Sequence, residues 1–255
     1  MLLAVDVGNT NMVLGVFEGS RLVMDWRIGT NHNLTSDEMG ILTEALFAQM
    51  QLAPHNFDGV IIASVVPPMQ KTLERWSRSY LRQDALWVSH KLKTGMPVLY
   101  DNPLEVGADR IVNAVAAYHE YPQKLIVVDF GTATTFDVVS EKGEYLGGAI
   151  TPGISISCEA LFQKASRLPR IEIEGQPKKA IATNTMDSMH AGIIYGYAGL
   201  VDGLVRKIQN EMDGGAMVLA TGGIAPAISP HTETIDGVDD LLTLKGLYLL
   251  YNLNK

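Results

Sequence analysis

The sequence predicts an α/β protein built from two similar halves. Strand-like apolar runs alternate with segments of helical spacing along the 255 residues, a pattern typical of mixed sheets flanked by helices. A group of three short strands also recurs: Asp129 follows Asp6 by 123 residues, and Gly131 follows Gly8 by the same interval. This interval is close to half of the chain and indicates an internal duplication. We therefore expect two domains of ordinary size, residues 1–120 and 121–255.

The first half opens with a predicted antiparallel meander. Its three β-type runs, separated by turn residues, are Leu2–Val7, Met12–Phe17 and Arg21–Ile28. Helices and strands then alternate, the helices marked by apolar residues three and four apart and the strands by continuous apolar runs. In order, these elements are the helix Ser36–Met50, the strand Gly59–Val65, the helix Met69–Arg82, the strand Ala85–Ser89 and the helix Pro103–His119.

The second half repeats this order. Its meander is expected at Lys124–Asp129, Thr134–Val139 and Glu144–Ile150. The elements that follow are the helices Ser155–Ala165 and Asp187–Met212, the buried strand Ala216–Ala220 and the helix Leu241–Leu253. Each half therefore contains strands and helices enough for a mixed sheet with helices packed against it.

Composition limits the classes of function. Twenty basic and 28 acidic residues give a net charge of −8, so we expect neither a general nucleic-acid binder nor a protein of anionic membranes. Apolar runs such as Gly59–Met69 are shorter than the roughly 18 residues of a membrane span. The apolar start runs directly into Asp6 without a basic lead-in, so no signal peptide is expected. The single cysteine, Cys158, excludes an internal disulfide and suits a reducing cytoplasm, where we place the protein.

A carboxylate followed by a glycine stands at the end of the first predicted strand. In the segment Asp6–Thr10, the glycine permits a close turn whose backbone amides can bind phosphoryl oxygens while Asp6 reaches a divalent ion. Taken alone, so short a pattern favours a simple hairpin turn in which Asp6 caps its own backbone. Its recurrence at Asp129–Thr132 favours the alternative that two such hairpins hold one phosphate chain.

Glycines also follow the last predicted strand. Thr221–Gly223 lets a flat adenosine ring approach the backbone, although an ordinary strand-to-helix turn explains the same residues. The glycine patterns of P-loop and Rossmann nucleotide sites do not occur in the sequence, so neither phosphate cradle is expected. The six histidines lack the spacing of zinc ligands.

An acid and a permanent cation are adjacent near the start of the predicted Pro103–His119 helix. A helix N-terminus favours anions. There, Asp109 can accept the proton of a hydroxyl that attacks a γ-phosphoryl group, and Arg110 can bind a carboxylate or phosphate. The alternative, an N-terminal acid beside a solvated arginine, stays open on local sequence alone. Asp137, in the strand after the second hairpin, is expected to support a loop rather than to bind an ion.

Together these motifs resemble a known family. Two Asp-x-Gly hairpins with a Thr-Gly-Gly segment are similar to the superfamily of acetate kinase, sugar kinases, Hsp70 and actin. The segments that narrow the resemblance to type III pantothenate kinase are Asp6–Thr10, Pro103–Arg110, Asp129–Asp137, Gly147–Gly153 and Asn184–Thr185. They occur in this order across nearly the whole chain, and the Gly-Ala-Asp-Arg element is far more specific than the hairpins.

The resemblance implies two ribonuclease-H-like, that is actin-like ATPase, domains. It also implies ATP-dependent phosphorylation of the 4′-hydroxyl of pantothenate, the first step of coenzyme A biosynthesis. In this scheme Asp109 accepts the proton, Asp6 lies near magnesium, and Asp129 holds a monovalent cation, potassium or ammonium. The implied ATP contacts are Asp6, Val7, Gly8, Asn9, Thr10, Asn11, Met12, Val13 and Thr132. The implied pantothenate pocket, which forms at a homodimer interface in the family, is lined by Tyr100, Gly107, Ala108, Asp109, Arg110 and Thr185.

Two other functions are weighed against this one. Some relatives are described as non-catalytic, ATP-binding transcriptional accessory factors, but such a module has no need of the three carboxylates Asp6, Asp109 and Asp129. A kinase of the same fold that acts on another small hydroxy acid is the second alternative. Only a panel of substrates separates it from pantothenate phosphorylation.

Overall fold

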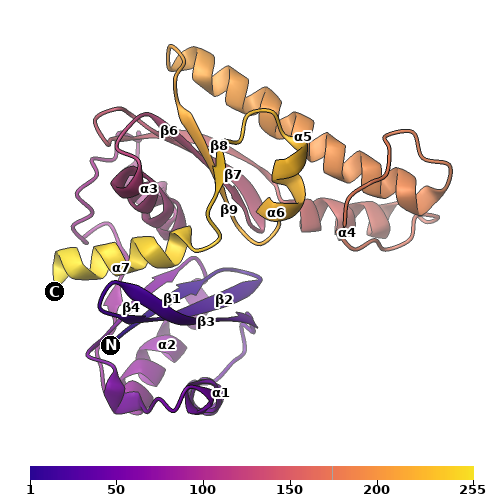
Figure 1. Cartoon of the computed structure of the whole chain (residues 1–255). Coiled ribbons are helices and arrows are strands. Elements are labelled where there is room, and N and C mark those ends of the chain that lie inside the picture. Colours follow the sequence, from indigo (N-terminus) through magenta and orange to yellow (C-terminus); the bar gives the residue numbers. More distant parts are fainter. Residues whose placement is uncertain (174) are drawn as a thin grey trace. The chain divides into compact units, whose positions relative to one another are not determined.

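The computed structural model describes residues 1–173 and 175–255, which form two compact units (Figure 1). The first unit consists of Met1–Gly95, Asp101–Ala116 and Thr243–Lys255, and the second of Met96–Tyr100 and Ala117–Leu242. The C-terminal segment Thr243–Lys255 thus belongs to the first unit by its contacts. The duplication of the sequence instead predicted one domain boundary near residue 120.

The first unit contains a five-stranded mixed sheet. Its strands are β1 (Leu2–Val7), β2 (Asn11–Glu18), β3 (Arg21–Gly29), β4 (Gly59–Ser64) and β5 (Leu86–Trp87). They lie in the order β3-β2-β1-β4-β5, with β2 antiparallel to both β1 and β3, and β4 parallel to both β1 and β5. The predicted meander is therefore confirmed, and β1 is the central strand.

Helices cover both faces of this sheet. Leu3, Val5 and Val7 alternate along β1 into one core with the helices α1 (Ser36–Gln49) and α2 (Gln70–Trp76). Figure 1 shows these two helices on one face of the sheet and α7 (Leu242–Asn254) on the other.

Close packing of α7 depends on small and aromatic residues. A Cβ on Gly15 would lie only 2.8 Å from the Cδ1 of Leu244, so the absence of a side chain lets α7 approach β2. Tyr248 of α7 stacks on Phe17 of β2 with 5.0 Å between the ring centroids. The α3 helix (Ala108–Glu120) packs on the same helix, because a Cβ on Gly246 would lie 2.3 Å from the backbone oxygen of Val112.

Two predicted helices are shorter than expected. The segment Met69–Arg82 is a regular helix only over α2, and a π-helical turn follows at Ser77–Leu81. The Ser77 hydroxyl donates to the Gln83 carbonyl, and Arg82 takes left-handed backbone angles that end the helix. Likewise the predicted Pro103–His119 helix divides into a 3-10 turn at Pro103–Glu105 and α3.

The second unit has a sheet of the same topology. Its strands are β6 (Leu125–Phe130), β7 (Ala133–Val139), β8 (Tyr145–Pro152), β9 (Met217–Thr221) and β10 (Gly237–Val238). The order β8-β7-β6-β9-β10 repeats that of the first sheet, strand by strand and with the same directions. This agreement supports the duplication inferred from the motif spacing, although the two-residue strand β10 had no counterpart among the predicted elements.

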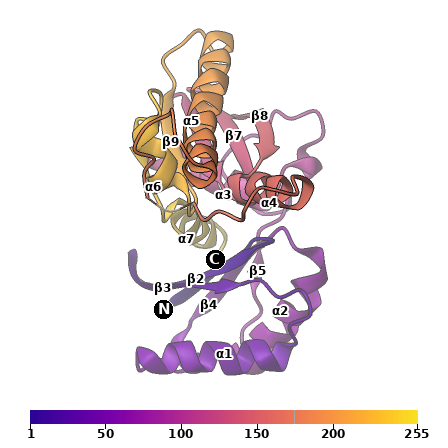
Figure 2. The same ribbon diagram turned by 90° about the vertical axis from the view of Figure 1, so that its right-hand side faces the viewer.

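Three helices cover one face of the second sheet: α4 (Ile154–Lys164), α5 (Thr185–Glu211) and α6 (Ala225–Ile228) (Figure 2). Phe136 of β7 shares a buried cluster with Ile154, Ile194 and Ile228 from these helices. In the part of the chain that the structure describes, no helix is both long enough and apolar enough to cross a membrane.

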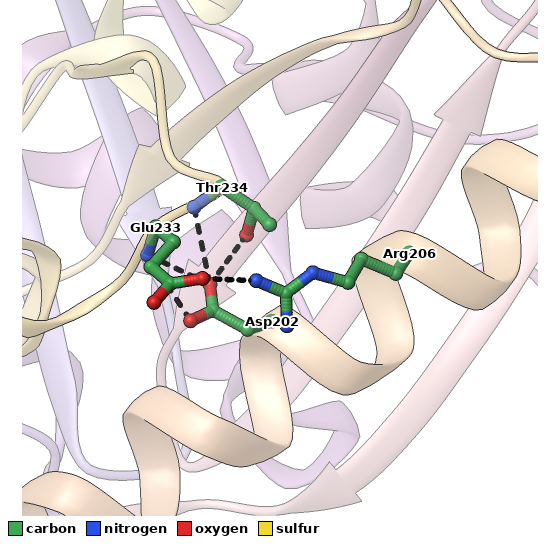
Figure 3. Close-up of polar contacts among 4 residues, drawn as sticks. All are labelled: Asp202, Arg206, Glu233 and Thr234. Carbon is green, nitrogen blue, oxygen red and sulfur yellow. Dashed lines mark hydrogen bonds and ion pairs between the residues drawn. The ribbon is translucent and has the colours of Figure 1, made fainter.

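A buried carboxylate on α5 holds the chain that leads into β10 (Figure 3). Asp202 accepts hydrogen bonds from the backbone N–H groups of Glu233 and Thr234 at 3.0 and 3.1 Å and from the Thr234 hydroxyl at 2.7 Å. An ion pair between Arg206 and Glu233 lies outside this contact and is exposed to solvent. The buried Asp202 carboxylate thus pairs with donors of the partly exposed chain before β10.

Candidate active site

The first Asp-x-Gly hairpin joins β1 to β2. The Gly8 N–H donates to the Asn11 carbonyl at 3.0 Å, and the Thr30 hydroxyl donates to the Gly8 carbonyl at 2.7 Å. A Cβ on Gly8 would lie 3.1 Å from the Asn11 oxygen, so this tight turn favours glycine. Asn9 and Thr10 are exposed at its tip.

The half-buried carboxylate of Asp6 precedes this turn. Asp6 pairs with Val13 on one side and with Ala63 on the other, in the middle of the sheet. Alternation along β1 places it on the face opposite to the core of α1 and α2. Val7 and Met12 have fully buried side chains, so they can meet a phosphate only through their backbones.

The Gly-Ala-Asp-Arg element lies at the start of α3, where Gly107 precedes the helix and Ala108–Arg110 are in its first turn, whereas the sequence predicted a helix that already begins at Pro103. The Asp109 Oδ1 accepts a hydrogen bond from the Arg110 N–H at 2.8 Å. A Cβ on Gly107 would lie 2.6 Å from the same oxygen, so the glycine leaves room for the carboxylate. Ala108 and Asp109 are half-buried and Arg110 is buried.

Burial raises the pKa of the Asp109 carboxyl above its ordinary value. The hydrogen bond from the Arg110 N–H and the positive charge of that guanidinium oppose the rise without cancelling it. The carboxylate is therefore a stronger base than an exposed aspartate, which is the property that proton abstraction needs.

The second Asp-x-Gly hairpin lies at the corresponding end of the second sheet. Asp129 pairs with Thr135 of β7 and with Thr221 of β9. The Gly131 N–H donates to the Ala133 carbonyl at 3.1 Å, which closes the turn. Thr132 is exposed at its tip.

Two further glycines close in on this hairpin. A Cβ on Gly153 would lie 2.1 Å from the Thr132 carbonyl oxygen. Gly222 has a φ of +94°, and a Cβ there would lie 2.7 Å from both the Asp129 Oδ1 and the Phe130 carbonyl oxygen. The Thr-Gly-Gly segment and the second hairpin thus meet at the C-terminal ends of β6 and β9. There the Asp129 Oδ1 and the Phe130 carbonyl oxygen both lie next to Gly222.

Tyr100 and Thr185, the other residues predicted for the pantothenate pocket, lie outside the two hairpins and the first turn of α3. Tyr100 is half-buried and belongs to the second unit, whereas Gly107–Arg110 belongs to the first. Thr185 is exposed as the first residue of α5, whose N-cap Asn184 accepts a hydrogen bond from the Asp187 N–H at 2.9 Å.

Sequence reasoning missed the contacts of Gly153 and Gly222. Gly222 lies next to Asp129 because β6 and β9 pair in parallel. The sequence motifs do not show which strands pair, so they could not predict this contact.

The family model for type III pantothenate kinase matches residues 2–207. The chain belongs to the type III pantothenate kinase family. A type III pantothenate kinase from Desulfatibacillum aliphaticivorans is 55% identical over 252 residues, which cover 99% of this chain and 98% of that one. One from Syntrophobacter fumaroxidans is 55% identical over 255 residues, covering 100% and 99%. As a member of this family the chain is an enzyme, a kinase that phosphorylates pantothenate in coenzyme A biosynthesis.

Solved structures that resemble this family member show the fold. A Campylobacter jejuni protein assigned to the Baf family of transcriptional activators matches with a TM-score of 0.60 and 18% identity, covering 98% of this chain and 97% of that one. A polyphosphate/ATP-glucomannokinase from Arthrobacter matches with a TM-score of 0.51 and 13% identity, covering 99% and 97%. The predicted fold class, two mixed sheets of the actin-like ATPase and sugar kinase type, is confirmed.

Proposed function

We propose that this pantothenate kinase transfers the γ-phosphoryl group of ATP to the 4′-hydroxyl of pantothenate, with Asp109 as the proton acceptor. The observation that carries the assignment is the half-buried Asp109 carboxylate, whose pKa is raised by burial, in the first turn of α3. When the hydroxyl oxygen attacks the phosphorus, its proton passes to Asp109 and the bond from the γ-phosphorus to the bridging oxygen of ADP breaks. Arg110 beside it binds the acceptor through its positive charge.

The two hairpins bind the phosphates of ATP in this proposal. Backbone N–H groups of residues 6–13 and the hydroxyls of Thr10 and Thr132 are the donors. Asp6 holds magnesium, because its half-buried carboxylate stands at the end of β1 before the turn, and carboxylate oxygens are donors that this ion prefers. Magnesium, when bound, neutralises phosphate charge.

Asp129 holds a monovalent cation, potassium or ammonium. The donor set suits such a cation, because the Asp129 Oδ1 and the Phe130 carbonyl oxygen both lie 2.7 Å from the place that a Cβ on Gly222 would fill. A bound cation at Asp129 adds positive charge to the surroundings of the triphosphate.

The pantothenate pocket is assigned to Tyr100, Gly107, Ala108, Asp109, Arg110 and Thr185.

We further propose a homodimer, because α4 exposes three large apolar side chains, Ile156, Leu161 and Phe162, over 11 residues. A cytoplasmic location agrees with the single cysteine.

A coupled ADP-release assay tests the function. ATP, magnesium and potassium are supplied with pantothenate, with glycerol, acetate or a hexose, or without an acceptor, and ADP release is expected with pantothenate alone. Turnover of another acceptor at an equal kcat/KM would contradict the assignment of pantothenate as the specific acceptor. Binding of ATP without turnover of any acceptor would favour the accessory-factor alternative.

Replacing potassium by sodium in the same assay tests the cation. We expect a low rate in sodium alone, and equal rates in potassium, ammonium and sodium would contradict the assignment at Asp129.

A further inference from the structure

A buried carboxylate, Asp137, is connected to Tyr100 through Tyr145 and has no role in the proposed transfer. Asp137 of β7 is fully buried. Its Oδ2 accepts a hydrogen bond from the Thr135 hydroxyl at 3.0 Å, and its Oδ1 accepts one from the Tyr145 hydroxyl at 2.7 Å. Since a buried carboxylate is costly without donors, these two hydroxyls are bound firmly in return.

Tyr145 links this carboxylate to the segment that carries Tyr100. It is the first residue of β8, and its N–H donates to the Pro97 carbonyl at 2.8 Å while its carbonyl accepts from the Leu99 N–H at 2.8 Å. This parallel bridge fixes the backbone next to Tyr100. The Tyr145 ring is itself fully buried, so its hydroxyl and its backbone are both held.

The ring of Tyr100 rests on two surfaces that this arrangement provides. Its centroid is 6.4 Å from that of Tyr145, at an interplanar angle of 53°, which is within the usual range for a tilted aromatic pair. On another side lies Gly147, where a Cβ would be 3.4 Å from the Tyr100 Cε2. Gly147 has a φ of +127°, which L side chains rarely adopt, so the flat backbone beside the ring depends on glycine.

We propose that Asp137 and Tyr145 are positioning residues that fix the orientation of Tyr100 and thereby the affinity of the enzyme for pantothenate. The inference rests on the proposed function, in which Tyr100 lines the pantothenate pocket. Neither residue touches the reacting atoms in this scheme. Their loss therefore weakens acceptor binding and leaves ATP binding and the proton transfer in place.

The test compares steady-state kinetics of the full chain carrying Tyr145→Phe, Asp137→Asn or Tyr100→Ala with those of the wild type. Tyr145→Phe keeps the ring and removes the hydroxyl, and we expect the KM for pantothenate to rise about tenfold while the KM for ATP and kcat stay within about twofold. Asp137→Asn keeps an acceptor for the Tyr145 hydroxyl, so it should raise this KM less. Tyr118→Phe is the matched control, because it removes a hydroxyl that donates to the Glu141 carbonyl at 3.0 Å in the same unit.

A double variant separates positioning from a general loss of structure. In the Tyr100→Ala background, adding Tyr145→Phe should raise the KM for pantothenate no further, since the ring that it orients is gone. An equal rise in both backgrounds would overturn the inference, and so would an unchanged KM in Tyr145→Phe when Tyr100→Ala raises it. If Tyr145→Phe does not fold, Asp137→Asn takes its place in the cycle with the same criteria.

Failure of the proposed function gives different results. A wild type that does not phosphorylate pantothenate overturns the function and the inference together. A wild type that does so, with a KM that Tyr100→Ala leaves unchanged, removes Tyr100 from the pocket and overturns the inference while the function stands.

Discussion

Asp109 combines a functional advantage with a cost in stability. Burial raises the pKa of its carboxyl in the folded chain, so the folded state holds this proton more tightly than the unfolded state does. Below the unfolded pKa of about 3.9, both states are protonated and the full contribution to stability is present. As the pH rises through the raised pKa, the buried carboxylate ionises and this contribution is lost.

Asp109→Asn should therefore inactivate the enzyme and stabilise it at neutral pH. Loss of the base lowers kcat by about 10² to 10⁴, while the amide oxygen still accepts the hydrogen bond from the Arg110 N–H. The Tm of the variant should exceed that of the wild type at pH 7, and the difference should disappear toward pH 3. Thermal unfolding across this pH range and initial-rate assays measure both effects. A variant that retains more than about a tenth of the wild-type kcat would exclude Asp109 as the base.

Gly222 allows a residue-scale test of the cation site. Gly222→Ala drives a methyl group against the Asp129 Oδ1 and the Phe130 carbonyl oxygen, each 2.7 Å away. We expect the potassium concentration for half-maximal activity to rise by about tenfold or more. Gly215→Ala is the matched control, because Gly215 also has a positive φ, +75°, but no atom lies within 4 Å of its Cβ position. An equal rise of the potassium requirement in both variants would show that backbone strain alone causes it. No rise in Gly222→Ala would contradict the cation site.

At the scale of elements, periodicity and turn residues predicted every strand of both meanders, because these signals are local. The π-helical turn after α2 was not predictable, since it depends on a hydrogen bond from Ser77 to the Gln83 carbonyl beyond the helix. Strand β10 is too short to show a period, and its place beside β9 depends on tertiary contacts. For the site, Asp109 was located at the start of its helix, but its raised pKa follows from burial and could not be inferred from the motif.

The link between α5 and the chain before β10 gives a prediction about stability. Asp202→Ala leaves two backbone N–H groups and the Thr234 hydroxyl without their acceptor, so the free energy of unfolding should fall by about 2 to 4 kcal/mol. Glu233→Gln removes only the exposed pair with Arg206 and should change stability little. Urea unfolding of both variants measures the difference. Equal stability of the two variants would mean that the buried carboxylate does not hold this loop.

At the scale of the whole molecule, one duplicated topology serves two different ions in the proposed scheme. Asp6 and Asp129 occupy equivalent ends of the central strands, but their parallel neighbours differ. Asp129 pairs with Thr221, which Gly222 follows, whereas Asp6 pairs with Ala63, which Ser64 follows. The Ser64 hydroxyl oxygen accepts a hydrogen bond from the Val66 N–H at 3.1 Å. At these two strand ends the halves therefore differ in the residue after the parallel partner, which is a serine in the first unit and a glycine in the second.

The proposed homodimer can be tested on the apolar surface of α4. Ile156 is 47% exposed there and stands on a helix that also exposes Leu161 and Phe162, so a charge at this position should prevent burial against a second copy. We expect the wild type to sediment as a dimer and Ile156→Glu as a monomer with a raised KM for pantothenate. Ile41→Glu is the control, since Ile41 is 67% exposed on α1, which exposes no other large apolar side chain. A dimeric Ile156→Glu would exclude this part of α4 from the interface, and a monomeric wild type at micromolar concentration would contradict the homodimer itself.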